Sequence, residues 1–294
     1  GLQRGIDFTG GRNYVVEFEE KVSPEQVKDA VQKAIDAKGQ GGTVSTLAIV
    51  TTQNPAVRIS TSYKIEQSGE KVDQEVEQLI WKSLYDNHLI KADYNTFKDR
   101  DNRVGGSIIS AQKVGPSVAA DLTRGAVISV ILSLAAIFIY ILARFRSVAF
   151  SVGAIIALTV DTFLIIAVYS ACWGWLPFSI EVDQTFIGAI LTVIGYSIND
   201  KVVVFDRIRE NLTLYPTRDT ERLFNDSINN TLTRTIMTSF TTLLVLLCIF
   251  FLGGDAIRSF SFAMILGVVI GTLSSIFLAA PIAFRIYAKR SAKK

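Results

Sequence analysis

The hydrophobic pattern of the chain changes near residue 116, from short alternating and helical periodicities to long apolar blocks. Beyond that point five blocks, each near the roughly 20 residues that cross a bilayer, are separated by polar connectors. They predict membrane-spanning helices, because a helix satisfies its own backbone polar groups inside lipid. The predicted spans cover about residues 125–143, 148–169, 184–205, 235–252 and 260–284.

Before residue 116 the pattern is that of a small soluble domain. Alternation of apolar and polar residues predicts strands, and apolar residues on one helical face predict helices. The first helix begins with Ser23 as N-cap and Pro24 at its first position. The order strand, helix, strand, strand, helix favours a ferredoxin-like α+β domain of about 100 residues. In chain order the predicted elements are a strand at 12–20, a helix at 23–37, strands at 43–50 and 56–63, and a helix at 71–88.

Composition places the domain boundary at the same point. Residues 1–116 hold 15 of the 30 Lys and Arg and 16 of the 27 Asp and Glu, which leaves 15 and 11 for residues 117–294. The charges of the second part lie mostly in the connectors, as membrane topology requires. We therefore expect a soluble domain over residues 1–116 and a membrane domain over residues 117–294. The net charge of +3 needs no nucleic-acid partner.

The connectors predict the orientation in the membrane. Basic connectors follow the first and third spans and the last span, whereas the connector over residues 170–183 has no Lys or Arg. Basic segments favour the cytoplasmic side. Five spans put the two ends on opposite sides, so we expect a cytoplasmic C-terminus and an external domain at the N-terminus, which in a bacterium is the periplasm.

Three ionisable residues lie where lipid is expected. They are Asp161 in the second predicted span, Asp200 in the third, and Arg234 at the start of the fourth. A charge at the centre of a membrane helix costs about 2.5–3.5 kcal/mol on insertion scales, and such residues mark ion paths by default. Asp200 lies about 9 Å deeper along its helix than Asp206, so it can meet Arg234 at a similar depth. The pair is either a proton relay or a structural link between helices, and Asp161 is either a further proton site or a structural carboxylate.

Polar and small residues surround these charges. Tyr196, Asn199, Thr235 and Thr238 can line a hydrated path or join helices by hydrogen bonds. Lys201, next to Asp200, either acts with it or extends its ammonium to the membrane interface. Gly188 and Gly195 lie on one helical face and allow close helix approach, as does the GxxxG over residues 267–271.

The sequence shows no catalytic, cofactor or metal motif. His88, the only histidine, ends a predicted helix, and its type and place indicate a solvated side chain. The two cysteines form no CxxC, and the glycine loop at residues 39–42 lacks the Lys-Ser/Thr of a phosphate-binding loop. We expect no enzyme, no cofactor and no metal.

Four motifs together resemble the SecF branch of the SecD/SecF protein-export family, which belongs to the resistance-nodulation-division superfamily. They are GIDFTGG at 5–11, VGP at 114–116, VIGYSINDKVVVFDRIREN at 193–211 and TLTRTIMTSFTT at 231–242. The resemblance implies proton-transport roles for Asp200 and Arg234. Val160 stands where the family often has His, which argues against a proton role for Asp161, and Lys201 replaces a small hydroxyl residue. It also implies one more helix before residue 5, so we expect a fragment or the second half of a fused SecDF.

The expected function is that of a proton-motive-force-driven accessory subunit of the Sec translocase in the bacterial inner membrane. The resemblance implies three partners: a SecD-like half, the SecYEG translocon and the translocating polypeptide. Two alternatives are a scaffold that stabilises the translocon without using energy, and a small-molecule or lipid exporter of the resistance-nodulation-division type. The exporter needs a larger external domain with a substrate cleft than about 110 residues provide.

Overall fold

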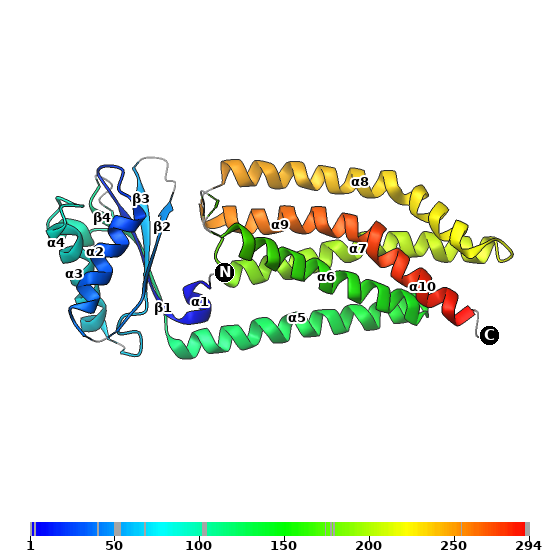
Figure 1. Ribbon diagram of the computed structural model, residues 1–294, viewed down its shortest axis with the longest axis horizontal. Coiled ribbons are helices and arrows are strands. Elements are labelled where there is room, and N and C mark those ends of the chain that lie inside the picture. Colours follow the sequence, from blue (N-terminus) through cyan, green and yellow to red (C-terminus); the bar gives the residue numbers. More distant parts are fainter. Residues whose placement is uncertain are drawn as a thin grey trace. The chain divides into compact units, whose positions relative to one another are not determined.

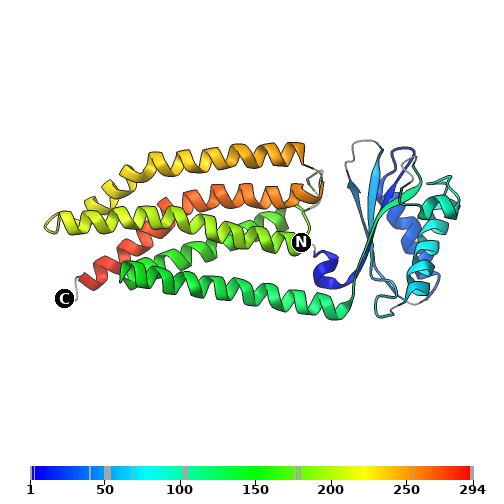
Figure 2. The same ribbon diagram turned by 180° about the vertical axis from the view of Figure 1, so that it is seen from behind.

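The structure is a computed structural model that describes all residues except 1, 3, 40, 50–53, 68, 102–104, 174, 177, 179, 254 and 292–294. The chain forms two compact units (Figures 1 and 2). The sheet unit comprises Gln3–Gly125 and Trp173–Gln184, and the helical unit comprises Gly1–Leu2, Ala126–Cys172 and Thr185–Lys294.

The sheet unit has the topology that the periodicity predicts. Its four strands lie in the order β2-β3-β1-β4 with every neighbour antiparallel, which is the ferredoxin-like arrangement. The sequence pattern did not predict two short helices, α1 and α4, or the last strand, β4. The elements are α1 (Ile6–Thr9), β1 (Gly11–Glu17), α2 (Pro24–Asp36), β2 (Val44–Ile49), β3 (Ala56–Thr61), α3 (Glu70–Asp86), α4 (Tyr94–Lys98) and β4 (Ser107–Val114). The last residue of the strand predicted at 43–50 lies outside the described residues.

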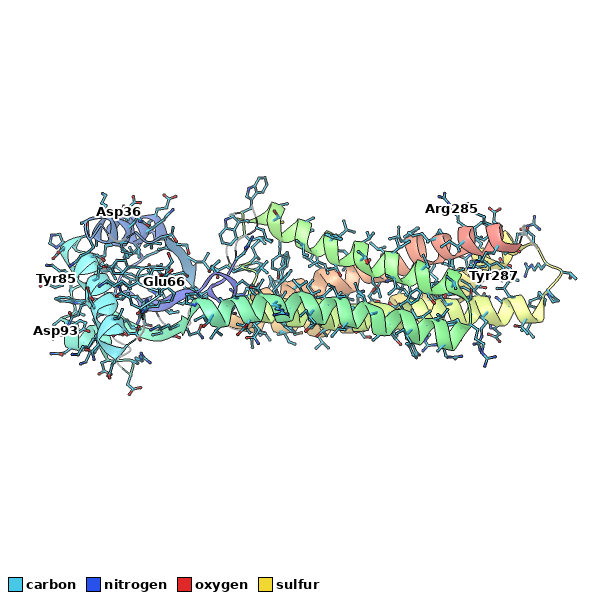
Figure 3. The ribbon with its side chains drawn as sticks, turned by 90° about the horizontal axis from the view of Figure 1, so that it is seen from below. Asp36, Glu66, Tyr85, Asp93, Arg285 and Tyr287 are labelled. Atoms are coloured by element: carbon cyan, nitrogen blue, oxygen red, sulfur yellow. The ribbon has the colours of Figure 1, made fainter. Side chains whose placement is uncertain are left out.

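The core of the sheet unit lies between the sheet and α2 and α3. Apolar residues at helical spacing on the two helices, such as Val27 and Ile80, meet alternate strand residues such as Val16 and Ile59, and all four are fully buried. Tyr85 near the end of α3 and Asp93 at the N-cap of α4 belong to the helical layer (Figure 3).

The helical unit consists of long helices whose sequences are apolar enough to cross a membrane. The chain is therefore a multi-pass membrane protein with five candidate spans in its described part. A buried cluster that includes Phe145, Phe150, Phe205 and Phe224 joins the helices near the end that carries the basic connectors. The helices are α5 (Pro116–Phe145), α6 (Val148–Cys172), α7 (Gln184–Leu214), α8 (Thr220–Leu252), α9 (Asp255–Ser274), the π-helical turn η1 (Ser275–Ala279) and α10 (Ala280–Ser291).

The helices extend past the spans that hydropathy predicts. The basic connector after the third span is mostly helical, because α7 continues to Leu214 and α8 begins at Thr220 with Asp219 as its N-cap. Hydropathy detects the part in lipid, whereas helical hydrogen bonding continues into water. In the last span, Pro281 lacks the N–H that an α-helix would donate to the carbonyl of Phe277, and the wider π turn ends just before it.

Candidate functional site

Close packing of α9 on α7 sets the geometry of the candidate site. A Cβ atom on Gly267 would lie 2.0 Å from a methyl of Val193, and one on Gly271 would lie 2.6 Å from the hydroxyl of Ser197. The predicted GxxxG face thus brings the two backbones together. It allows small polar side chains of α9 to reach α7 in the middle of the unit.

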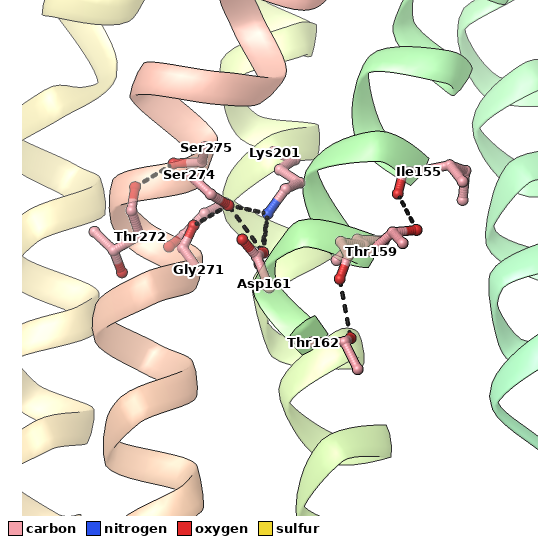
Figure 4. Close-up of polar contacts among 12 residues, drawn as sticks. Ile155, Thr159, Asp161, Thr162, Lys201, Gly271, Thr272, Ser274 and Ser275 are labelled. Carbon is pink, nitrogen blue, oxygen red and sulfur yellow. Dashed lines mark hydrogen bonds and ion pairs between the residues drawn. The ribbon is translucent and has the colours of Figure 1, made fainter. Parts of the chain in front are cut away.

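Asp161 and Lys201 form a buried ion pair between α6 and α7. The ammonium of Lys201 donates to Asp161 Oδ2 at 2.9 Å, and neither side chain is more than 2% exposed. Two hydroxyls complete the contact: Lys201 also donates to Ser197 at 2.5 Å and to Ser274 of α9 at 2.9 Å. Figure 4 shows the carboxylate, the ammonium and Ser274 meeting between three helices. The suggestion that Lys201 reaches the interface is wrong, because all three of its donors are used inside the unit.

The carboxylate of Asp161 is asymmetrically satisfied. Its Oδ2 accepts from Lys201, from Ser197 at 2.9 Å and from Ser274 at 2.8 Å. Its Oδ1 is buried and has no hydrogen-bond partner among the described residues. The two serines therefore orient one oxygen toward the ammonium and leave the other free.

Asp200 directly precedes Lys201 on α7 but faces other partners, and its polar contacts are weaker. The residue is 3% exposed, and its carboxylate faces two hydroxyls: Ser239 of α8, which donates a long hydrogen bond of 3.5 Å, and Thr272 of α9. Ser239 in turn shares a 2.5 Å hydrogen bond with Thr272 of α9. Asp200 is thus a buried carboxylate that faces hydroxyls and forms no ion pair with a described residue.

Arg234 does not complete a pair with Asp200. It is exposed and lines an open pocket of about 810 Å³ between α7 and α8. The pocket also contains the ion pairs Arg144–Asp206, at 3.1 Å, and Arg207–Glu210, at 2.8 Å. Among the described residues no ion pair involves Arg234. The two residues share one region, but direct contact requires side chains or helices to move.

The other predicted polar residues lie in three different environments. Tyr196 joins helices, since its hydroxyl donates to the Thr238 carbonyl at 3.3 Å and contacts the Thr242 hydroxyl at 3.1 Å. Thr235 is buried with a hydroxyl that has no described partner. Asn199 and Thr238 are exposed at the surface of the helical unit.

Gly188 and Gly195 are also exposed, and a Cβ atom on either would meet no atom within 4 Å. Among the described residues, no other helix packs closely on these two glycines. With Thr192 and Asn199 they form an open stripe of small and polar residues along α7.

The sequence pattern missed three of the hydroxyl residues that contact the buried charges, namely Ser197, Thr272 and Ser274. Serine and threonine are common in membrane helices, so residue type alone does not distinguish these three. Their positions on α7 and α9 near the GxxxG face are the signal that could have found them.

The described residues contain no group of three or more His, Cys, Asp or Glu placed to hold a metal ion. His88 is exposed and follows the C-cap residue of α3, Asn87, with a φ of 57°.

Together, five candidate membrane spans, a small ferredoxin-like sheet unit and buried ionisable residues define the class: a polytopic membrane protein with an intramembrane charge cluster. The family model "Protein export membrane protein SecD/SecF, C-terminal" matches residues 96–289, and the "SecD/SecF GG Motif" matches residues 1–22. The chain belongs to the SecD/SecF family of protein-export membrane proteins.

Individual relatives match over nearly the whole chain. Protein translocase subunit SecF of Rhodothermus marinus is 37% identical over 294 residues, which are 100% of this chain and 86% of the relative. SecF of Haemophilus influenzae is 35% identical over 99% of this chain and 78% of the relative. The crystal structure of the translocon-associated membrane protein SecDF from Thermus thermophilus matches with a TM-score of 0.73 and 31% identity, covering 98% of this chain and 34% of that one. These findings confirm the resemblance and the fold class.

Proposed function

We propose that this chain is a proton-motive-force-driven accessory subunit of the Sec protein translocase. Its relatives are named as translocase subunits, which supports a role in protein translocation and a non-catalytic one. The observation that carries the energy-coupling part is Asp200, a buried carboxylate in a membrane helix with no ion-pair partner among the described residues. Such a group is costly to keep ionised, so it is suited to take up and release a proton.

The structure favours Asp200 over Asp161 as the proton carrier. Lys201 neutralises Asp161 at 2.9 Å, so protonation of that carboxylate would leave an ammonium buried without its counter-ion. Asp200 carries no such penalty. A role for Asp161 as a proton site is therefore not part of the proposal.

Arg234 is the second member of the proposed relay. It lines the open pocket at the basic end of the helical unit, through which water can approach. On α8 it lies five residues before Ser239, about 7.5 Å along the helix, and Ser239 contacts Asp200. A shift of α8 against α7 would bring guanidinium and carboxylate together when Asp200 is ionised and separate them when it is protonated. The resulting helix movement is what we propose drives the external domain.

The proposed partner in the membrane is a SecD-like half. The SecDF protein of Thermus thermophilus contains both halves in one chain, and this chain covers 36% of it. The open stripe of Gly188, Thr192, Gly195 and Asn199 on α7 is suited to packing against another membrane helix. SecYEG and an emerging polypeptide complete the proposed assembly, in the bacterial inner membrane with the sheet unit in the periplasm and the C-terminus in the cytoplasm.

Export into inverted membrane vesicles, with and without a proton gradient, tests the proposal. Asp200→Asn in the complete SecD–SecF pair should abolish the gradient-dependent part of export and leave the remainder. Asp226→Asn is the matched control, because Asp226 is a partly exposed carboxylate of α8 that pairs with Arg218 at the surface. Gradient-dependent export that survives in the assembled Asp200→Asn protein would refute the relay and support the scaffold.

A further inference from the structure

The ammonium of Lys201 occupies an unusual environment. It is fully buried and surrounded by three side-chain oxygens from three helices: Asp161 Oδ2 on α6, Ser197 Oγ on α7 and Ser274 Oγ on α9. The second oxygen of Asp161 is also buried and has no partner among the described residues. Three oxygens, from one carboxylate and two hydroxyl groups, thus converge around one positive charge, and the second oxygen of the same carboxylate has no hydrogen bond with a described residue.

This set of ligands is the kind that hard metal cations take. Carboxylate and neutral oxygen ligands suit hard cations, whereas softer metals select nitrogen and sulfur. The hydroxyls of Ser197 and Ser274 both donate to Asp161, so their lone pairs are directed at the ammonium, as they would be at a metal ion. The cation that these oxygens surround carries a charge of +1, and it is the side-chain ammonium of Lys201.

The charge balance of the buried cluster leads to the same conclusion. Asp161, Asp200 and Lys201 together carry a net charge of −1 when all are ionised, so one further positive charge neutralises the cluster. Without Lys201 the same cluster would carry −2, and a second mobile cation would be required. Arg234, the remaining charged group nearby, lines the open pocket and pairs with neither carboxylate.

We propose that Lys201 is a tethered cation that fills an oxygen site for a monovalent metal ion at Asp161, and thereby excludes Na⁺ from the helical unit. If the proposed function is right, the consequence is that the unit couples to a single proton at Asp200. The site itself depends only on the geometry around Asp161. Lys201 is in this sense a residue that determines ion specificity.

The test removes the tethered charge and asks whether Na⁺ replaces it. Lys201→Ala opens space next to Asp161, whereas Lys201→Met removes the charge but keeps the side-chain volume. Lys201→Ala combined with Asp161→Asn removes both charges. Each variant is purified with its SecD-like half, and the Tm and the binding of radioactive Na⁺ are measured in NaCl against choline chloride at equal ionic strength.

The expected result is that Lys201→Ala alone binds Na⁺. Its Tm should rise by about 3–6 °C at a Na⁺ concentration tenfold above the dissociation constant. For the wild type, for Lys201→Met and for the double variant, the Tm in NaCl should equal that protein's Tm in choline chloride. Recovery of folded Lys201→Ala only when NaCl is present would also support the proposal.

Three results would overturn it: equal stability of Lys201→Ala in both salts, failure to recover that variant in either salt, or an equal Na⁺ response in the wild type or Lys201→Met. None of these results concerns export. The tethered-cation proposal can therefore fail while Asp200→Asn still abolishes gradient-dependent export, and the reverse outcome is equally distinguishable.

Discussion

Breaking the Asp161–Lys201 pair from one side should strongly destabilise the helical unit. Asp161→Asn leaves the ammonium of Lys201 buried with two serine hydroxyls and an amide oxygen, but with no counter-ion. Removing one partner of a buried ion pair costs about 3–5 kcal/mol. Replacing both partners, with Asp161→Asn and Lys201→Met, removes the uncompensated charge and should cost about 2 kcal/mol or less, because the remaining polar groups can satisfy one another.

A double-mutant cycle measures this difference. Reversible unfolding in mixed micelles gives the free energy of unfolding for the wild type, both single variants and the double variant. We expect the double variant to be more stable than Asp161→Asn, with a coupling energy above about 2 kcal/mol. Single variants that each cost less than about 1 kcal/mol and add without coupling would show that the two side chains do not form the pair described.

Three further predictions concern local structure and can be checked by hydrogen exchange on the intact protein. Burial alone would raise the pKa of Asp73, but hydrogen bonds from Lys113 and Arg12 outweigh it and lower the pKa. The ionised carboxylate stabilises the folded sheet unit by about 1–2 kcal/mol, a figure kept low because the group is partly exposed. This stabilisation is present above the ordinary pKa of an aspartate carboxyl and is lost as the pH falls through the lowered pKa. Asp73→Asn should remove that pH dependence from hydrogen exchange in β1. Gly10→Ala should cost about 1–3 kcal/mol and speed exchange in β1, because φ 72° and ψ 148° suit glycine alone; exchange equal to the wild type would contradict this. Gly267→Ala should separate α9 from α7 at a cost of about 1–3 kcal/mol. Adding Val193→Ala removes the two clashing methyls and should restore part of the exchange protection, because the Cβ of residue 193 remains 2.9 Å away; no recovery would contradict the clash.

The sheet unit could be predicted because its signals are local. Ser23 is at the predicted N-cap of α2, where its N–H donates to Gln26 at 3.4 Å, and Pro24 begins the helix. The strands at residues 44–49 and 56–61 end within two residues of their expected limits. The last strand, β4, was not predicted, because Gln112 and Lys113 are exposed and its pattern mixes polar with apolar residues.

The membrane site could be predicted only in its residue types. A charge in an apolar block shows that something must compensate it, and Asp161, Asp200 and Arg234 were recognised in this way. The partner of each charge depends on the rotation and axial register of α6, α7 and α9, and neither is encoded in the spacing along one helix. Lys201 follows Asp200 directly, yet the roughly 100° turn between successive helix residues directs it to Asp161 instead.

Infrared difference spectroscopy on the reconstituted SecD–SecF pair tests most directly whether Asp200 is the residue that takes up the proton. Acidification of the external side should produce a carboxylic-acid band that disappears in Asp200→Asn and persists when Asp161→Asn and Lys201→Met are combined. A band that survives in Asp200→Asn and disappears in the combined variant would contradict the account and assign the proton to Asp161.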